Sequence, residues 1–435
     1  MCDIKKNILK RNKYITHSGL CMRLPSRCLL LLVIAGCGSS PVPGQRIDFT
    51  YETLGVEVER DNVIQNASHL DGFFEKLYRL QETNDGKVSI VHIGDSHIQA
   101  DYLTSIVRRN FHRHFGNAGR GLIVPLRVAG TNEPNNYKTV SNTTWQSKRC
   151  VFPDQPLPIG IGGVTISTSD PQANLEIYMN DLWLNYSFNK LTLFYEKDER
   201  SFDFSVRGPG GAALGNIVAN PDDSSRSSSQ VSWERKVNAV TLQSLKSNSG
   251  QSHAVIFGAV LENSMPGILY HTIGVNGAKF QHYREAECFA PQTAALGADL
   301  FIISLGTNES SDYPYMNRNF PLEMHQFLSS LQRHNPLAEF ILVTPQAVFR
   351  QGNKHNPGIL QVRQQILDYA VENGFAFYDM FRAMGGPHSA HDWSEQALLS
   401  NDGIHLTKDG YEYQGNLFYH ALMKGYNQYV PARHP

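Results

Sequence analysis

Three runs of almost continuous apolar residues most constrain how this chain can fold. They are residues 88–93 (VSIVHI), 299–305 (DLFIISL) and 339–344 (EFILVT). In a strand with one exposed face, apolar and polar residues alternate, whereas a strand covered by helices on both faces is apolar throughout. These runs therefore predict buried strands of a parallel sheet. A weaker strand is expected at residues 375–378.

Helical patterns separate these strands. Apolar residues recur at helical spacing over residues 66–80, 102–115, 323–332 and 359–371, and a last helix is expected from Lys408. Alternation of strands and helices predicts an α/β fold with a parallel sheet flanked by helices. In such a fold ligands bind at the carboxyl ends of the strands.

The pattern changes between residues 126 and 262. Short alternating runs such as residues 163–167 (GVTIS) and 191–195 (LTLFY) are separated there by clusters of Gly, Pro, Asn and Ser. This spacing is typical of an all-β sandwich. We therefore expect a β-sandwich insert over 126–262, between two parts of one α/β domain at 63–125 and 263–435.

Length and charge agree with this organisation. At 435 residues the chain is long enough for two folded units. Lys and Arg number 39 against 40 Asp and Glu, a formal net charge of -1. Because nothing in this balance attracts nucleic acid or anionic lipid, a neutral polymer or a small ester is the expected partner.

The N-terminus resembles a bacterial lipoprotein signal. Basic residues precede the apolar stretch 28–34 (CLLLLVI), which ends on Ala35-Gly36-Cys37. The resemblance implies a signal peptide at 1–37, lipidation of Cys37, and a location on the bacterial cell envelope, lipid-anchored at the periplasmic face of the outer membrane. The alternative is an uncleaved membrane anchor, although the run is shorter than the ~20 residues that span a bilayer. Residues 38–62 are expected to form a tether.

Only two cysteines, Cys150 and Cys288, fall in the folded part. An oxidising periplasm would permit a disulfide between them, and free thiols are the alternative. No cysteine and histidine cluster has metal-ligand spacing, so we expect neither a metal nor a cofactor.

Residues suited to nucleophilic catalysis follow the first strand and recur near the end of the chain. Ser96 lies in Gly94-Asp95-Ser96-His97, and Asp402 precedes His405 by three residues. Asp402 can accept from one ring nitrogen of His405 while the other nitrogen faces Ser96, as serine acyl transfer requires. Taken singly, each segment also suits a turn ahead of a helix, with Ser96 or Asp402 as its cap.

Two further segments can supply donors for an oxyanion. Asn308 follows the strand at 299–305, and its side-chain amide is one candidate. In residues 273–278 (IGVNGA), a glycine allows a backbone N–H to approach a substrate; Gly277 is the better candidate and Gly274 the second. Either segment alone also suits an ordinary turn.

The order of these residues resembles the SGNH (GDSL) superfamily of hydrolases. Ser96, Gly277, Asn308, Asp402 and His405 occur in the order of that family's four motif blocks. The resemblance implies a flavodoxin-like sheet, Ser96 as nucleophile, His405 as general base and Asp402 as its orienting partner. It also implies an oxyanion hole made by the Ser96 and Gly277 amides and the Asn308 side chain. A Gly-x-Ser-x-Gly elbow is missing at Ser96, which disfavours the α/β-hydrolase fold.

A narrower resemblance is to the bacterial peptidoglycan O-acetylesterases. It rests on residues 94–97 (GDSH), 115–121 (FGNAGRG), 270–278 (YHTIGVNGA) and 306–309 (GTNE). Those enzymes carry a carbohydrate-binding-like β-sandwich between the first two blocks. The resemblance implies hydrolysis of acetyl esters at C6 of N-acetylmuramic acid through an acetyl-enzyme. An esterase or acetyltransferase for another polysaccharide, and a vestigial glycan-binding lipoprotein, are the alternatives.

Several side chains near these motifs have two interpretations. Aromatic residues of the insert can stack on sugars, but half or more of them are expected in the sandwich core; they are Trp145, Trp183, Tyr186 and Trp233. His92 and His97 are expected to be packed or hydrogen-bonded neighbours of Ser96. Glu309 either orients the Asn308 loop or is solvated.

Overall fold

The protein was analysed as a computed structural model that describes residues 62–152, 157–180, 184–219, 228–350 and 354–433. The expected signal peptide, the lipidation site Cys37 and all of the tether except Asn62 lie outside these ranges. None of the helices in the described ranges is both long and apolar enough to cross a bilayer.

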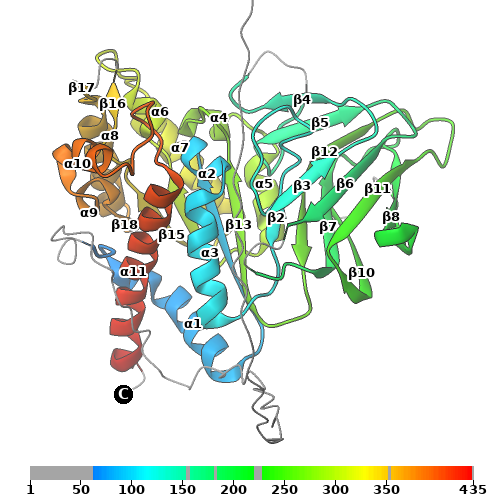
Figure 1. Ribbon diagram of the computed structural model, residues 1–435, viewed down its shortest axis with the longest axis horizontal. Helices are drawn as coiled ribbons and strands as arrows, with labels where there is room; N and C mark the ends of the chain where they lie inside the picture. Colours follow the sequence, from blue (N-terminus) through cyan, green and yellow to red (C-terminus); the bar gives the residue numbers. More distant parts are fainter. Residues whose placement is uncertain (1–61, 153–156, 181–183, 220–227, 351–353, 434–435) are drawn as a thin grey trace, which may run out of the picture. The chain divides into compact units, whose positions relative to one another are not determined.

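A five-stranded parallel sheet forms the centre of the α/β part (Figure 1). Its strand order is β13-β1-β14-β15-β18, and every neighbouring pair is parallel. The strands are β1 (Lys87–Gly94), β13 (Gly267–Gly274), β14 (Leu300–Ser304), β15 (Glu339–Val343) and β18 (Ala376–Tyr378). The expected parallel sheet is thus confirmed. β13 was not predicted as a strand, although the apolar residues 268–273 carried the signal.

Helices cover both faces of this sheet. Alternate residues of β1 face opposite sides, with Val88 and Ile90 in one apolar cluster and Val91 and Ile93 in the other. The first cluster includes α1, α3 and α11, and the second includes α4, α5, α7 and α8. The longer helices are α1 (Asp71–Thr83), α3 (Tyr102–Phe115), α7 (Phe320–His334), α8 (Gly358–Glu372) and α11 (Lys408–Arg433).

Short helices and a small hairpin complete the α/β part. Three short helices follow strands of the parallel sheet: α2 (Ser96–Gln99) follows β1, α4 (Phe280–Arg284) follows β13, and α6 (Thr307–Ser310) follows β14. A further short helix, α5 (Phe289–Thr293), comes after α4. The remaining elements are α9 (Met380–Ala383), α10 (Ser389–Glu395), β16 (Phe349–Arg350) and β17 (Lys354–His355). Short 3-10 turns lie at Ala67–Leu70, Pro209–Gly211, Ala294–Leu296 and Gly386–His388.

Two antiparallel sheets form the insert. The first has the order β10-β7-β12-β5-β4, with β2 also paired to β12, and the second has the order β3-β6-β11-β8-β9. The strands of the first are β2 (Gly121–Ile123), β4 (Gln146–Arg149), β5 (Val164–Thr168), β7 (Phe188–Tyr195), β10 (Ser228–Val237) and β12 (Ala254–Glu262). Those of the second are β3 (Tyr137–Val140), β6 (Asn174–Met179), β8 (Asp203–Arg207), β9 (Ala213–Ile217) and β11 (Ala239–Leu245).

The insert is not an isolated module. Buried residues of both antiparallel sheets belong to the same apolar cluster as Ile273 of β13 and Phe301 of β14. β2 falls before the expected boundary at residue 126, yet it already pairs with β12 of the antiparallel sheet. The insert and the α/β part therefore share one continuous core.

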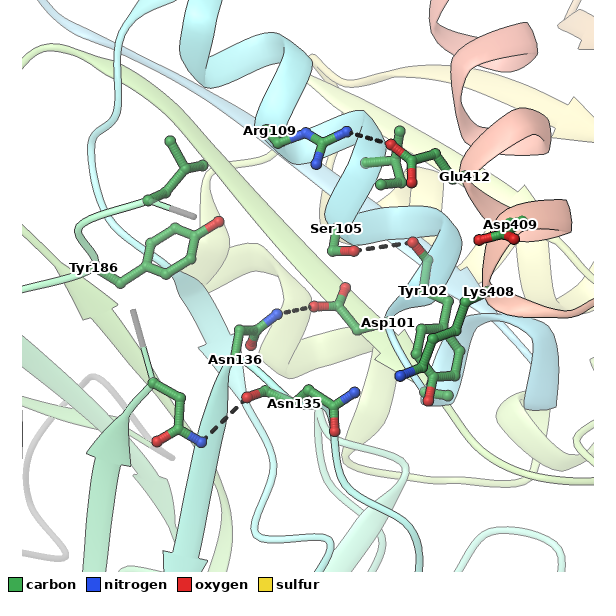
Figure 2. Close-up of a pocket in the computed structure, with 14 residues that line it drawn as sticks. Asp101, Tyr102, Ser105, Arg109, Asn135, Asn136, Tyr186, Lys408, Asp409 and Glu412 are labelled. Carbon is green, nitrogen blue, oxygen red and sulfur yellow. Dashed lines mark hydrogen bonds and ion pairs between the residues drawn. The ribbon is translucent and has the colours of Figure 1, made fainter. Parts of the chain in front are cut away.

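A buried charge network also joins the insert to the α/β part. Asp101, at the start of α3, accepts from Arg108 at 3.1 Å and from Arg120 at 3.2 Å, and Asn136 of the insert also donates to it (Figure 2). Arg108 Nε donates to the Tyr186 hydroxyl of the insert at 3.1 Å. Burial alone would raise the pKa of the Asp101 carboxyl, but Arg108 and Arg120 outweigh it and hold that pKa well below its usual range.

Removing the Asp101 charge should destabilise the whole unit. Asp101→Asn leaves Arg108 and Arg120 buried without an anionic partner, and the expected loss in free energy of unfolding is about 3–5 kcal/mol. Urea denaturation at neutral pH measures it. Asp368→Asn, at an exposed position of α8, is the matched control and should change the value by less than about 0.5 kcal/mol. Equal stability of the two variants would contradict a structural role for the network.

Candidate active site

The residues singled out from the sequence converge at one edge of the parallel sheet. Gly94 at the end of β1 pairs with Gly274 of β13 on one side and with Ser304 of β14 on the other. The segments that follow these three strand ends carry Ser96, Gly277 and Asn308. Parallel strands end at the same edge, so three distant parts of the sequence meet there.

Ser96, His405 and Asp402 form a continuous chain of hydrogen bonds. His405 Nε2 lies 2.8 Å from Ser96 Oγ, although 309 residues separate them. His405 Nδ1 lies 2.7 Å from Asp402 Oδ2. A carboxylate can only accept, so Nδ1 carries the proton and Nε2 is left to accept from the Ser96 hydroxyl. This is the geometry in which a serine can be deprotonated for attack.

Local bonds hold the acidic member of this chain in place. The other oxygen of Asp402 accepts from the backbone N–H groups of Ile404 and His405, both at 2.9 Å. Partial burial would raise the pKa of Asp402, but its hydrogen bonds, the one from His405 foremost, lower that pKa below its usual value. The side chains of His405 and Asp402 are 36% and 49% exposed, so a substrate can reach the imidazole from solvent.

Close packing of α2 against the strand ends positions Ser96. A Cβ at Gly94 would lie 2.3 Å from Ile98 Cγ1 and 2.7 Å from the Ser304 carbonyl oxygen, and one at Gly274 would lie 2.3 Å from the Gln99 nitrogen. Only glycine allows that approach. Asp95 caps the helix by accepting from the His97 N–H at 3.0 Å.

The expected oxyanion donors lie around the same point. Gly277 has a φ of +82° and open space where a Cβ would be, while Gly274 packs against the Gln99 backbone. This geometry favours Gly277 over Gly274 as the donor that faces a ligand. The Asn308 amide donates to Asp95 Oδ2 at 3.1 Å and to the Ala278 carbonyl oxygen at 3.0 Å. Both N–H groups of the amide are used in these bonds, which hold the amide beside the segment that carries Gly277.

Asp95 is therefore a further member of the site that the sequence pattern did not reveal. It is 1% exposed and contacts both the nucleophile helix and Asn308. Burial raises the pKa of its carboxyl to about 6. Its position inside the Gly94–His97 tetrapeptide, next to Ser96, could have indicated a role in the site. From sequence alone, however, an aspartate that forms a turn there was an equally good explanation.

The neighbouring histidines are hydrogen-bonded, as expected. His92 lies 2.7 Å from both the Tyr270 hydroxyl and Ser304 Oγ, and its burial lowers its pKa to about 3. His97 Nδ1 lies 2.9 Å from the Tyr411 hydroxyl, and its ring centroid lies 5.1 Å from that of His405. Burial, with a smaller effect of His405, lowers the pKa of His97 to about 3, so both rings are neutral at pH 7.

Glu309 orients the Asn308 loop and is not solvated. The side chain is buried, and its Oε1 accepts from the Phe280 N–H at 2.8 Å. Burial raises the pKa of its carboxyl to about 7. The contact ties α6 to α4, the helix that follows Gly277.

One loop of the insert reaches the site. Asn132 accepts from Gln99 Nε2 at 2.7 Å and from Asn276 Nδ2 at 2.7 Å. The Gln99 side chain in turn accepts from the Asn276 N–H at 2.7 Å. Sequence reasoning missed these three residues, because no local pattern connects positions that lie on three separate segments.

The remaining candidates of the insert are largely structural. Trp145 and Tyr186 are buried, and Trp233 packs against the core, while Trp183 lies outside the described residues. Trp145, Tyr186 and Trp233 therefore fit the core interpretation. Cys150 of the insert and Cys288 of the α/β part are both free thiols, so the disulfide between them is wrong.

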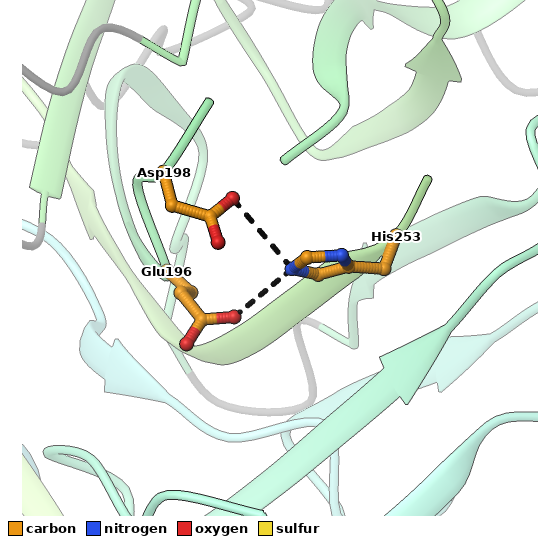
Figure 3. A group of neighbouring side chains, drawn as sticks. All are labelled: Glu196, Asp198 and His253. Carbon is orange, nitrogen blue, oxygen red and sulfur yellow. Dashed lines mark hydrogen bonds and ion pairs between the residues drawn. The ribbon is translucent and has the colours of Figure 1, made fainter. Parts of the chain in front are cut away.

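One group of side chains in the described ranges has metal-binding residue types: Glu196, Asp198 and His253 (Figure 3). It was not apparent from sequence spacing, because His253 comes from a distant segment. His253 Nε2 lies 3.1 Å from Glu196 Oε2 and 3.7 Å from Asp198 Oδ1. Asp198 also accepts from the Arg200 N–H and the Ser201 hydroxyl, both at 2.9 Å. Hydrogen bonds within the group and to its neighbours account for this cluster.

Comparisons with known proteins agree with the fold. Residues 239–413 match the model of the GDSL-like lipase/acylhydrolase family. This match begins within the insert, at β11, and does not include Ser96. A solved peptidoglycan O-acetylesterase shares the fold with a TM-score of 0.70 at 20% identity, over 85% of this chain and 99% of that one. A comparison with curated proteins found no significant match.

Shorter likenesses cover part of the chain. An acetylxylan esterase from Geobacillus stearothermophilus has a TM-score of 0.27 at 19% identity, over 36% of this chain and 73% of its own. A GDSL-like lipase from Bacteroides thetaiotaomicron has a TM-score of 0.28 at 19% identity, over 36% and 76%. Residues 239–413 thus carry a GDSL-like lipase/acylhydrolase domain, and the described part of the chain has the SGNH hydrolase fold.

If the Asn308 amide stabilises an oxyanion, its removal should slow the chemical step and leave substrate binding almost unchanged. We expect Asn308→Ala to lower kcat for 4-nitrophenyl acetate by about 10²–10³-fold with little change in KM. Steady-state kinetics measures both constants. Asn373→Ala, just after the end of α8, makes the same change of side chain away from the site and is the control, which should keep the parent kcat and KM. An effect confined to KM would argue against the oxyanion role.

Proposed function

We propose that this protein is a serine O-acetylesterase that removes acetyl groups from cell-wall glycan, specifically from the C6 hydroxyl of N-acetylmuramic acid in peptidoglycan. The observation that carries the proposal is the hydrogen-bonded chain from Ser96 through His405 to Asp402 beside the Asn308 amide. The substrate is inferred from likeness of fold to a peptidoglycan O-acetylesterase over 85% of the chain, insert included.

The proposed reaction has two half-reactions. His405 Nε2 takes the proton of Ser96 as Oγ attacks the acetyl carbonyl carbon. The resulting oxyanion accepts from the Ser96 and Gly277 N–H groups and from the Asn308 amide, which exchanges one of its bonds to Asp95 and Ala278 for it. The bond between the carbonyl carbon and the sugar oxygen then breaks, and His405 gives the proton to that oxygen, which leaves as the sugar hydroxyl. Water, deprotonated by His405, attacks the acetyl-Ser96 ester, which releases acetate and restores the serine.

Acetate release from O-acetylated peptidoglycan tests the assignment. Ser96→Ala should lower the rate by at least about 10³-fold, because the nucleophile is lost, while Ser252→Ala on the insert surface should retain it. Circular dichroism establishes that both variants are folded. Unchanged acetate release by Ser96→Ala would refute a serine mechanism.

Acetylated xylan, assayed in parallel, separates the two substrate classes. A higher kcat/KM for xylan would transfer the proposal to another acetylated polysaccharide. Labelling of the protein by a serine-directed fluorophosphonate, lost in His405→Ala, would exclude a vestigial glycan-binding protein. Supplying a glycan acceptor and measuring its acetylation tests the acetyltransferase alternative.

We further propose that the enzyme is held at the cell envelope by a lipid on Cys37. Its support is the basic and apolar sequence that precedes Ala35-Gly36-Cys37. In a bacterial host, Cys37→Ser should move the protein from the membrane fraction to the soluble fraction and abolish incorporation of labelled palmitate. Ser39→Ala, two residues on, is the control. Retention of Cys37→Ser in the membrane with no label would favour an uncleaved anchor.

A further inference from the structure

A cavity of about 410 Å³ lies between α3, the start of α11 and the loops of the insert (Figure 2). The α/β part contributes Tyr102, Arg109 and Lys408 to its lining, and the insert contributes Asn135, Asn136 and Asn180. We propose that this cavity is a subsite that binds an N-acetylated sugar residue of the glycan chain that carries the scissile acetyl group. The inference rests on the proposed function and specifies how that substrate is held.

Stacked rings connect the cavity to the candidate general base. The Tyr102 ring, in the cavity wall, stacks on the Tyr411 ring with centroids 5.9 Å apart and an angle of 18°. The Tyr411 hydroxyl bonds to His97, whose ring lies beside His405. Along the chain, Lys408 follows His405 by only three residues. The cavity and the candidate general base are therefore joined by one series of packed side chains.

A single loop of the insert borders both places. Asn132 bonds to Gln99 and Asn276 beside the expected oxyanion hole, and three residues later Asn135 and Asn136 line the cavity. The end of this loop is anchored, since Asn136 contacts the buried Asp101 and accepts from Arg120 Nε at 2.9 Å. The loop thus holds its cavity residues at a constant distance from the site. Preorganisation of this kind lowers the entropic cost of binding.

The charges of the lining favour a neutral ligand. Arg109 donates to Glu412 at 2.9 Å, and exposed Lys408 is matched by the adjacent Asp409. The carboxylate of Asp101 is compensated by Arg108 and Arg120. A phosphate or a polyanion would find no excess of positive charge here.

The polar groups that remain suit hydroxyl and acetamido groups. Asn135 and Asn180 are exposed. The Asn180 amide donates one hydrogen to the Asn135 carbonyl oxygen at 3.1 Å, so its second N–H and its side-chain oxygen remain for a ligand, together with the Asn135 amide. The Nε–H of Arg109 is buried and makes no hydrogen bond within the described part of the chain. The ring of Tyr102 forms part of the wall and has the Lys408 ammonium 5.8 Å from its centroid. A cavity of this size with a few polar groups is typical of small-ligand sites.

Binding of a defined oligosaccharide tests the subsite directly. The probe is chitotetraose, a tetramer of N-acetylglucosamine, titrated calorimetrically into Ser96→Ala. We expect the added double change Asn135→Ala and Asn180→Ala to raise Kd at least about 10-fold, and Ser105→Trp, which fills the cavity from α3, to do the same. Gln230→Ala, exposed on β10 of the insert, is the control and should keep the parent Kd.

Cellotetraose, which lacks the acetamido groups, should bind at least about 10-fold more weakly than chitotetraose. Either an equal Kd in the double variant and its parent, or no binding of chitotetraose to the parent, would overturn the subsite. Ser105→Trp is informative only if circular dichroism shows a folded protein, and the double variant decides the question without it.

Kinetics separates this inference from the proposed function. In the active enzyme, with Ser96 unchanged, the double change Asn135→Ala and Asn180→Ala should lower kcat/KM for O-acetylated peptidoglycan about 10-fold. The value for 4-nitrophenyl acetate should stay unchanged, and the loss for peptidoglycan should come from a higher KM. An unchanged ratio would overturn the subsite and leave the esterase assignment intact. A protein that binds chitotetraose in the cavity but releases no acetate from peptidoglycan would refute the proposed function and retain the subsite.

Discussion

The site depends first on the parallel pairing of β1 with β13 and β14. The register aligns Gly94 with Gly274 and with Ser304, so that the segments leaving three strands begin side by side. Serine catalysis needs its nucleophile and donors within a few ångströms. The hydrogen bonds of the ladder impose that proximity on residues that are far apart in sequence.

Small residues and one buried carboxylate turn this alignment into a defined geometry. Gly94 and Gly274 allow α2 to lie against the strand ends, where a Cβ would collide with Ile98 or with the Gln99 backbone. Asp95 bonds to both α2 and the Asn308 amide. Ser96 and Asn308 are therefore held relative to one another by a single side chain, and this rigidity favours a preorganised site.

The insert also helps to fix the geometry of the site, because it contacts the α/β part at several places. Its strands share a core with the parallel sheet, its Asn136 and Tyr186 bond to the Asp101 network, and its Asn132 bonds to Gln99. A buried carboxylate with two arginines is stable only when all three partners are present. The insert is thereby fixed beside α3, and the cavity between them has a defined shape.

The sequence by itself determined most of the helices and strands of the α/β part, though not β13, and the order of the motifs. The helix expected at 102–115 is observed at Tyr102–Phe115, because its apolar stripe and the glycine that follows it are local signals. Ser96, Asn308, Asp402 and His405 were identified from residue type and order. Only the tertiary structure decided that β13 lies beside β1, that Asp95 contacts Asn308, and that Asn132 and Asn135 border the site and the cavity. Those contacts join separate segments through packing and register, and no local periodicity records them.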